Sequence, residues 1–416
     1  MNVYAWIVLV ALVGEFILSV VTSVLNVRAM SPAVPDEFRA AYDDDAYARS
    51  QAYTRVQSRF GLFQGTLSLL ALLVFWQLGG FGWLDDACRA FGLGPVPTGL
   101  MFVGSLLVGS TVLGLPFRLY ATFVIEERFG FNRTTWRTFG LDLVKGLALG
   151  GVLGGTLLAL LLFLFETAGP VAWIGCWAAT TVFALAAQLL APTWIMPLFN
   201  TFSPLEQPEL KEALVDYARS THFPLDDIFV VDGSRRSAKA NAFFTGFGSR
   251  KRIGLFDTLI ERHTTQELVA VVAHEVGHYK RGHMLKSLAL GVVHTGALFW
   301  LLAQFLERPG LFEAFAVSEP SVYAGMVFFG LLFTPIDLVL SVLINLVSRK
   351  HEFEADAFAA ATTGAVEPMV AALTKLSTDS LSNLTPHPLQ VFLHHSHPPV
   401  LRRIAALRAL GSVPGS

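Results

Sequence analysis

The chain has 416 residues, of which 53% are hydrophobic and 15% are charged, and its formal net charge at pH 7 is −2. Soluble domains usually carry about 25% charged residues, so this composition indicates a membrane protein. The near-neutral charge gives no reason to expect a nucleic-acid partner. Cys88 and Cys176 are too few for a disulfide framework or a cysteine-based metal site, and we expect both to be unpaired small hydrophobic residues.

Seven apolar runs are long enough to cross about 30 Å of hydrocarbon. The first lacks a basic leading segment and a small-residue cleavage site, so it is interpreted as a span and not as a signal peptide. The seven predicted spans are residues 4–25, 60–78, 100–124, 146–165, 171–195, 285–306 and 322–347.

Lysine and arginine residues gather in alternate connections between these runs. The segments after the first, third, fifth and seventh runs hold most of them, including eleven between Lys211 and Arg281, whereas the other loops hold only Arg89 and Arg308. Basic loops stay in the cytosol. We therefore predict that the N-terminus lies outside, and that the long segment between the fifth and sixth runs and the C-terminus lie in the cytosol. The membrane would be the plasma (inner) membrane if the chain is bacterial, or the endoplasmic reticulum if it is eukaryotic.

The runs divide the chain into four parts. Residues 1–198 would hold five transmembrane helices, 199–283 a cytosolic segment, 284–347 two more helices, and 348–416 a cytosolic C-terminal segment. Charges inside the predicted spans are few, and the three that stand out are expected to face a cavity or a partner, because a charge is costly in lipid. They are Glu15, Arg118 and Asp337.

The cytosolic segment shows strand and helix patterns. Residues 226–234 (DDIFVVDGS) resemble a short buried strand, and 241–249 and 251–260, joined across a GSR turn, predict a β-hairpin. Thr264 or Thr265, with Glu267 close behind, is typical of a helix start. The sequence therefore predicts a small β element followed by a helix.

Two histidines lie on one face of that helix. His274 and His278 are four residues apart, which is about one turn, and Glu275 follows the first of them. Neutral imidazoles at this spacing can both bind one Zn²⁺, and Glu275 would take a proton from the water that attacks a peptide bond. The pattern is typical of zinc peptidases; the alternative is an ordinary amphipathic helix with surface histidines.

A third ligand is expected in residues 348–358 (SRKHEFEADAF), directly after the last run. Glu352 and Asp356 share a helical face, whereas Glu354 points elsewhere and is predicted to be a solvated surface charge. One carboxylate as a ligand and a second one orienting a ligand histidine match known zinc sites. The alternative is a charged helix stabilised by neighbouring ion pairs. Both clusters lie at the same predicted membrane face, which favours a shared site.

The segments HEVGHYKRGH (274–283) and SRKHEFEAD (348–356) together resemble the integral-membrane CAAX prenyl protease family, seven-span zinc endopeptidases of the a-factor converting type. The likeness extends over nearly the whole chain. Four-span heat-shock membrane proteases share the zinc motifs but lack the first spans. Further similar stretches are EERFGFNRTT (126–135), APTWIMPLFNTFSPLE (191–206), NAFFTGFGSRKRIGLFDTL (241–259) and SHPPVLRRI (396–404).

The resemblance implies an all-α polytopic fold in which seven transmembrane helices surround a chamber, capped by a cytosolic zincin-like domain with a small β-hairpin. It implies one Zn²⁺ per chain, held by His274, His278 and Glu352, with Glu275 as the general base.

Four further roles are implied by the same resemblance. Asp356 would hold a zinc-binding histidine or donate a proton, and Asn241, His397 and Arg403 would line the substrate cleft. Asn241 and His397 would hold the peptide backbone or the oxyanion of the tetrahedral intermediate. Without the resemblance, His397 would be interpreted as an ordinary loop histidine.

The predicted function is therefore a zinc endopeptidase acting on a peptide or protein substrate at the membrane. By resemblance, its substrate is the C-terminal tripeptide after a prenylated cysteine; a broad quality-control protease of membrane proteins is an alternative. A transporter or channel with a structural zinc is the alternative from another class. Structural zinc usually has four protein ligands, whereas three good ones are visible here, and no inverted repeat is apparent.

Overall fold

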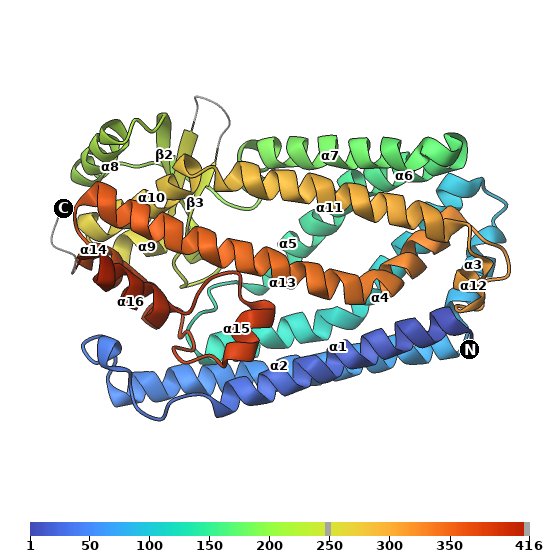
Figure 1. The fold of residues 1–416 in the computed structure, drawn as a ribbon, viewed down its shortest axis with the longest axis horizontal. Coiled ribbons are helices and arrows are strands. Elements are labelled where there is room, and N and C mark those ends of the chain that lie inside the picture. Colours follow the sequence, from blue (N-terminus) through green and yellow to red (C-terminus); the bar gives the residue numbers. More distant parts are fainter. Residues whose placement is uncertain (246–250, 412–416) are drawn as a thin grey trace.

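The computed structural model describes residues 1–245 and 251–411 and is built mainly from helices (Figure 1). Within the described residues, seven helical stretches are long and apolar enough to cross a membrane, as predicted. They are α1 (Val3–Arg28), α2 (Asp44–Gln77), α4 with η2 (Pro95–Tyr120, Ala121–Glu126), α5 with η3 and α6 (Trp136–Leu149, Gly150–Gly154, Gly155–Thr167), η4 with α7, η5 and η6 (Gly169–Val171, Ala172–Leu190, Ala191–Ile195, Met196–Leu198), α11 (His283–Leu306) and α13 (Val322–Thr363).

Two of these helices extend far beyond the predicted spans. Helix α2 already begins at Asp44, where Asp43 caps it by accepting a 2.6 Å hydrogen bond from the Ala46 N–H. Helix α13 continues to Thr363 over 42 residues, so the last span and the segment of the predicted third ligand form one uninterrupted helix. Hydropathy marks the part of a helix that meets lipid, whereas capping and packing decide where the helix ends.

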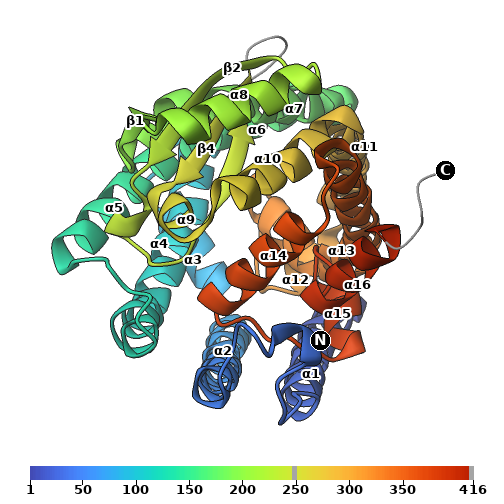
Figure 2. The same cartoon turned by 90° about the vertical axis from the view of Figure 1, so that its left-hand side faces the viewer.

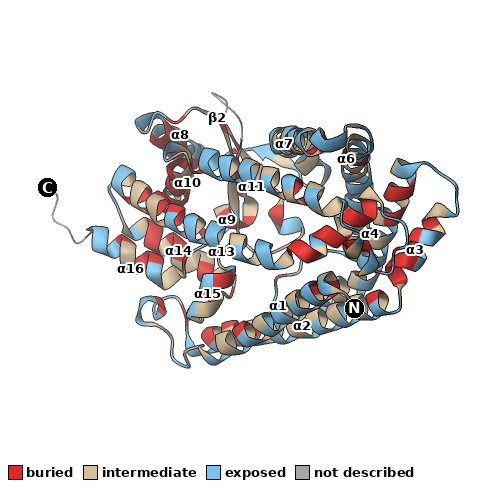
Figure 3. Ribbon diagram, turned by 45° about the vertical axis from the view of Figure 1, so that its right-hand side comes forward, coloured by how far each residue is buried: buried red, intermediate tan, exposed pale blue. Residues whose placement is uncertain are grey.

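Viewed end-on, the spans are arranged in an open ring (Figure 2). In six of the seven, only 6–11% of the most apolar stretch is buried, whereas α13 reaches 28%. A helix packed around a filled core normally buries an apolar stripe at least about 100° wide. Much of the inner faces of the six spans is therefore not packed against a filled core, and Figure 3 shows mostly exposed and intermediate residues along α2, α7 and α11. A buried cluster that includes Val8, Phe102 and Leu302 does join the spans over part of their length.

One end of the ring is closed by α3 (Gly80–Arg89) and α12 (Pro309–Glu313), next to the N-terminus (Figure 1). Phe315 stacks on Phe328 with a 4.1 Å centroid distance, and the Trp76 ring nitrogen donates to the Ala314 carbonyl at 2.7 Å. Cys88 and Cys176 are buried and unpaired, as predicted.

The opposite end carries the sheet and the helix with the two predicted zinc-binding histidines (Figure 1). A four-stranded sheet has the order β1-β2-β4-β3, with β2 and β4 parallel and the other pairs antiparallel. The predicted hairpin is β3–β4, and its turn lies outside the described residues. The strands are β1 (Phe202–Pro204), β2 (Leu225–Val231), β3 (Ala242–Thr245) and β4 (Lys251–Phe256).

Six helices complete this end. Of these, α8, α9 and α10 pack with the sheet around a buried apolar core that includes Leu214, Ile228, Leu255 and Val272. This core fixes the sheet against α10, the helix that carries the two histidines. The helices are α8 (Pro208–Ser220), α9 (Asp257–Arg262), α10 (Thr265–Lys280), α14 (Glu367–Asp379), α15 (Pro388–His394) and α16 (Val400–Gly411).

Helices α10 and α13 approach each other closely at Gly277. A Cβ atom at this position would lie 3.1 Å from both the Cα and the carbonyl oxygen of Ala355. The glycine between the two histidines therefore allows the polar half of α13 to lie directly against α10. This contact brings Glu352 beside His274 and His278.

Candidate metal centre

Helix α10 begins at a capping box, as the sequence predicts. The Thr264 hydroxyl accepts the Glu267 N–H at 3.3 Å, and the Glu267 carboxylate accepts the Thr264 N–H at 2.8 Å. Lys375 of α14 donates to the same carboxylate at 2.7 Å. Burial raises the pKa of Glu267, but the hydrogen bonds from Lys375 and Thr264 outweigh it, and the net pKa is lowered.

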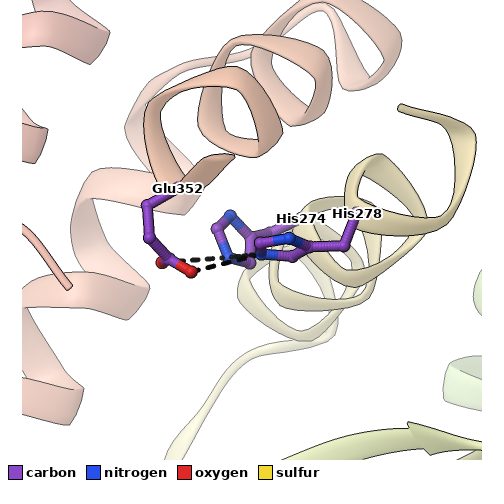
Figure 4. Close-up of side chains that lie close together, drawn as sticks. All are labelled: His274, His278 and Glu352. Atoms are coloured by element: carbon purple, nitrogen blue, oxygen red, sulfur yellow. Dashed lines mark hydrogen bonds and ion pairs between the residues drawn. The ribbon is translucent and has the colours of Figure 1, made fainter. Parts of the chain in front are cut away.

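The side chains of His274, His278 and Glu352 converge between α10 and α13 (Figure 4). The Nε2 atoms of the two histidines are 3.1 Å apart. Glu352 places Oε2 at 3.5 Å from His274 Nε2 and Oε1 at 3.3 Å from His278 Nε2. One ligand atom from each residue lies within 4.8 Å of the others, and the described residues contain one such group.

These three residues fit a divalent metal ion. Glu352 Oε2 is buried without a hydrogen-bond partner among the described residues, which is costly for a carboxylate. Two imidazole nitrogens and one carboxylate are also the protein ligands of many catalytic zinc sites. A cation held by the three groups would satisfy the buried oxygen and both facing nitrogens.

Asp356 and Arg403 support the first histidine from behind. Asp356 Oδ1 lies 2.8 Å from His274 Nδ1, and Arg403 donates to both carboxylate oxygens of Asp356 at 2.8 and 2.6 Å. Arg403 also lies 3.2 Å from Glu352 Oε2. Burial lowers the pKa of His274, but the hydrogen bonds with Asp356 and Glu352 outweigh it and raise that pKa to about 9. The pocket thus favours a positive charge on or beside His274.

A second chain of contacts supports His278. Its Nδ1 lies 3.0 Å from His283 Nδ1, and His283 Nε2 lies 2.9 Å from Glu354 Oε2. The carboxylate can only accept, so a neutral His283 donates from Nε2 and accepts at Nδ1. His278 must then donate from Nδ1, which leaves its Nε2 lone pair free for a metal.

This contact corrects the prediction for Glu354. The residue does point away from Glu352, but its side chain is 33% exposed and paired with His283, so it is not a solvated surface charge. The pairing of Glu354 with His283 could not be predicted from the sequence, because His283 begins a new helix after Gly282, whose φ is +68°. Helical spacing cannot relate residues across such a break.

Glu275 lies on the open side of the cluster. Together with His278 it lines a cavity of about 510 Å³ that also touches Phe244 and Met284. His397 is not among the lining residues of this cavity, but it is 64% exposed and lies 3.4 Å from Glu352 Oε1. A water molecule or a peptide can therefore reach Glu275 without disturbing the buried side of the centre.

The remaining predicted site residues lie in different surroundings. Arg403 is buried against Asp356 and Glu352, on the closed side of the centre. Asn241 is exposed at the start of the edge strand β3, where its amide oxygen accepts the Ala242 N–H at 2.9 Å. Its carbonyl accepts the Phe256 N–H at 3.1 Å, which begins the hairpin.

Comparison with known proteins gives two family matches, one to the N-terminal half of the chain and one to the C-terminal half. A family model described as CAAX prenyl protease N-terminal, five membrane helices, matches residues 23–201. The model of peptidase family M48 matches residues 204–411. Their junction falls at β1, just after the fifth span ends and where the sheet begins.

Individual relatives are similar over nearly their whole length. The chain is 34% identical to CAAX prenyl protease 1 of Saccharomyces cerevisiae, covering 92% of this chain and 89% of the relative. It is 33% identical to the CAAX prenyl protease 1 homolog of Homo sapiens, covering 91% and 89%. The crystal structure of S. mikatae Ste24p superposes with a TM-score of 0.92 at 30% identity, covering 98% of this chain and 99% of that one.

Proposed function

The chain belongs to the CAAX prenyl protease family within peptidase family M48, and from this membership we propose how its metal centre works and which substrate it takes. Membership makes the protein a multi-pass membrane metalloendopeptidase, as the sequence predicts. The transporter and channel interpretation is set aside, because the zinc motif lies in a peptidase and not in a transport fold.

We propose that the ion is Zn²⁺, one per chain, held by His274, His278 and Glu352. The two-histidine, one-carboxylate ligand set and the unsatisfied Glu352 oxygen support this assignment. When bound, the ion would act as a Lewis acid on the scissile carbonyl and on the attacking water.

The chain's own side chains do the proton transfer and the positioning. Glu275 would accept the proton of the attacking water and later give it to the leaving amine, because its carboxylate lines the cavity beside His278. Asp356 would keep His274 in the tautomer that presents Nε2, with Arg403 holding Asp356 in place. Since Asp356 is buried behind His274, we assign it this positioning role and not proton donation.

Two exposed residues would hold the substrate. His397 is exposed and lies 3.4 Å from Glu352, where an N–H donor would stabilise the oxyanion that develops on the scissile carbonyl. Asn241 precedes the edge strand β3, whose outer side is available to pair with an extended peptide. Together these roles would hold the peptide next to the metal centre.

The proposed substrate is a protein with a prenylated C-terminal cysteine, from which the enzyme removes the last three residues. The relatives are named CAAX prenyl proteases, and a ring of spans fits a substrate anchored in the bilayer. We further propose that the catalytic end faces the cytosol, because the basic residues gather in the segments on that side. The N-terminus at the other end would lie outside (Figure 1).

The observation that carries this proposal is the buried His-His-Glu group beside a cavity lined by Glu275. The test is cleavage of a farnesylated CAAX peptide by the protein in detergent, with an unprenylated peptide alongside. We expect Glu275→Gln to lower kcat by roughly 10²–10⁴-fold, which is the usual contribution of a general base, while both proteins bind about one zinc. Full activity in Glu275→Gln, or bound zinc without cleavage of either peptide by the wild type, would contradict the proposal.

A further inference from the structure

A second cavity of about 760 Å³ adjoins the active-site cavity. Its wall comes from the end of the fifth span, from the sheet and from the first turns of α11. Among the described lining residues, only Gln188, Thr193 and Arg252 are polar. A volume in this range and a mostly apolar wall are typical of cavities that bind small apolar molecules.

The two cavities are continuous along one wall. Gln188, Phe244, Met284 and Leu288 line both of them, and the smaller cavity also contains Glu275 and His278. A group bonded to the residue next to the scissile peptide bond can therefore enter the larger cavity while that bond lies at the metal centre.

The larger cavity is lined in part by exposed apolar residues of two membrane spans. Leu189 near the end of α7 is 48% exposed, and Leu285 in the first turn of α11 is 68% exposed. Both helices belong to membrane spans. An apolar chain that enters this cavity would stay in apolar surroundings, which is more favourable for each of its CH₂ groups than contact with water.

Its polar wall residues do not favour an anionic or polar ligand. The Arg252 guanidinium lies 3.6 Å from Asp226 and 5.6 Å from the centre of the Phe229 ring, so its charge already has partners. The sheet side is aromatic: a Cβ atom on Gly254 would lie 2.5 Å from the Phe243 ring, so this glycine lets the ring lie over β4. The wall as a whole suits a flexible hydrocarbon chain.

We propose that this cavity binds the isoprenoid chain of the substrate while the adjacent peptide bond is cleaved. This inference rests on the proposed function and adds the place where the lipid is recognised. The cavity is hereafter called the lipid pocket.

The first test locates the chain directly. A farnesyl-type CAAX peptide with a benzophenone at the end of its isoprenoid is irradiated with the Glu275→Gln protein, and adducts are mapped by mass spectrometry. We expect adducts on residues 185–193 and 284–288 and on Phe243 or Phe244. A peptide carrying the benzophenone on its C-terminal residue should label other positions. Lipid adducts confined to α1, α2 or α4 would overturn the proposal.

The second test fills part of the lipid pocket with a larger side chain. Leu189→Trp places a larger side chain at the rim, and Val182→Trp is the matched control, because Val182 lies on the same helix, is 65% exposed and does not line the pocket. The readout is the ratio of kcat/KM for the farnesylated peptide to that for the unprenylated peptide. We expect Leu189→Trp to lower this ratio roughly tenfold and Val182→Trp to leave it within about twofold.

The two proposals fail in different ways. If the wild-type protein cleaves neither peptide, the proposed function is wrong. If it cleaves the farnesylated peptide but Leu189→Trp leaves the ratio unchanged, the function stands and the lipid pocket is wrong.

Discussion

His274 and His278 face each other through Nε2 because each Nδ1 is engaged elsewhere. Asp356 contacts His274 directly, whereas Glu354 reaches His278 through His283. Both arrangements end in a carboxylate, which fixes the direction of the hydrogen bonds. Each imidazole is therefore held in the tautomer that a metal ion requires before the ion arrives.

This arrangement makes Glu354 a positioning residue for His278. Glu354→Gln keeps an oxygen that accepts the His283 N–H, whereas Glu354→Met has about the same length and no comparable acceptor. We expect Glu354→Met to weaken metal binding by roughly 10–100-fold and Glu354→Gln to stay within a few-fold of wild type. Competition with a chelator measures this directly. Equal zinc affinity in Glu354→Met and wild type would show that the contact is only structural.

At the scale of single residues, the sequence predicts those residues of the metal centre that are related by helical spacing. His274, His278, Glu352 and Asp356 come from two i, i+4 pairs, and the structure brings all four together. The contact between His283 and Glu354 cannot be predicted in this way, because it joins the first turn of α11 to a different helix, α13. A contact between separate helices depends on how those helices pack, and spacing along one helix carries no information about that.

At the scale of elements, the site depends on how closely α10 and α13 pack. Gly277→Ala would place a methyl group 3.1 Å from two backbone atoms of Ala355, and backbone atoms cannot rotate away. We expect the helices to separate by a few tenths of an ångström, with a loss of about 1–3 kcal/mol in stability and weaker zinc binding, because Glu352 moves away from the histidines. Thermal unfolding with and without zinc measures both effects.

A matched substitution controls for helix propensity. Gly291→Ala in α11 would place its methyl group in open space, with nothing within 4 Å among the described residues. We expect this variant to be as stable as wild type or slightly more stable. If both alanine variants behaved alike, close packing at Gly277 would not be what holds Glu352 in place.

Elements with strong local signals could be predicted, and those set by distant pairing could not. The seven spans follow from hydropathy, and the start of α10 follows from the Thr264–Glu267 capping box. Strand β1 has three residues and ends in proline, so it shows no alternation and forms because β2 pairs with it. The parallel pairing of β2 with β4 is equally a product of tertiary structure.

At the scale of the whole molecule, the two halves that the family models separate are joined at Arg236. This side chain donates to both carboxylate oxygens of Asp142 in α5, at 2.7 and 3.0 Å, and to Asn200 and the Phe199 carbonyl. Nearby, Lys239 bonds to Tyr53 at 2.8 Å and lies 3.0 Å from Glu126. The N-terminal spans are thus anchored to the catalytic end by charged hydrogen bonds.

Loss of this anchor should loosen one half from the other. We expect Arg236→Met to lower stability by about 1.5–3 kcal/mol, because three acceptors, one of them charged, lose a partly buried donor. A lower unfolding temperature in detergent and faster proteolysis between the halves would report this change. Arg235→Met is the control, because Arg235 is exposed and adjacent. Equal behaviour of the two variants would exclude Arg236 as the anchor.

Helix α13 contains both the last membrane span and the metal-centre residue Glu352. With 42 residues it is about 63 Å long, roughly twice the thickness of the hydrocarbon layer. Pro335 lies in its membrane half and Glu352 in its other half. A helix of this kind adjusts its tilt to the thickness of the surrounding lipid. Glu352 lies on α13, whereas His274 and His278 lie on α10. We therefore expect a change in membrane thickness that tilts α13 to alter the geometry of the metal centre.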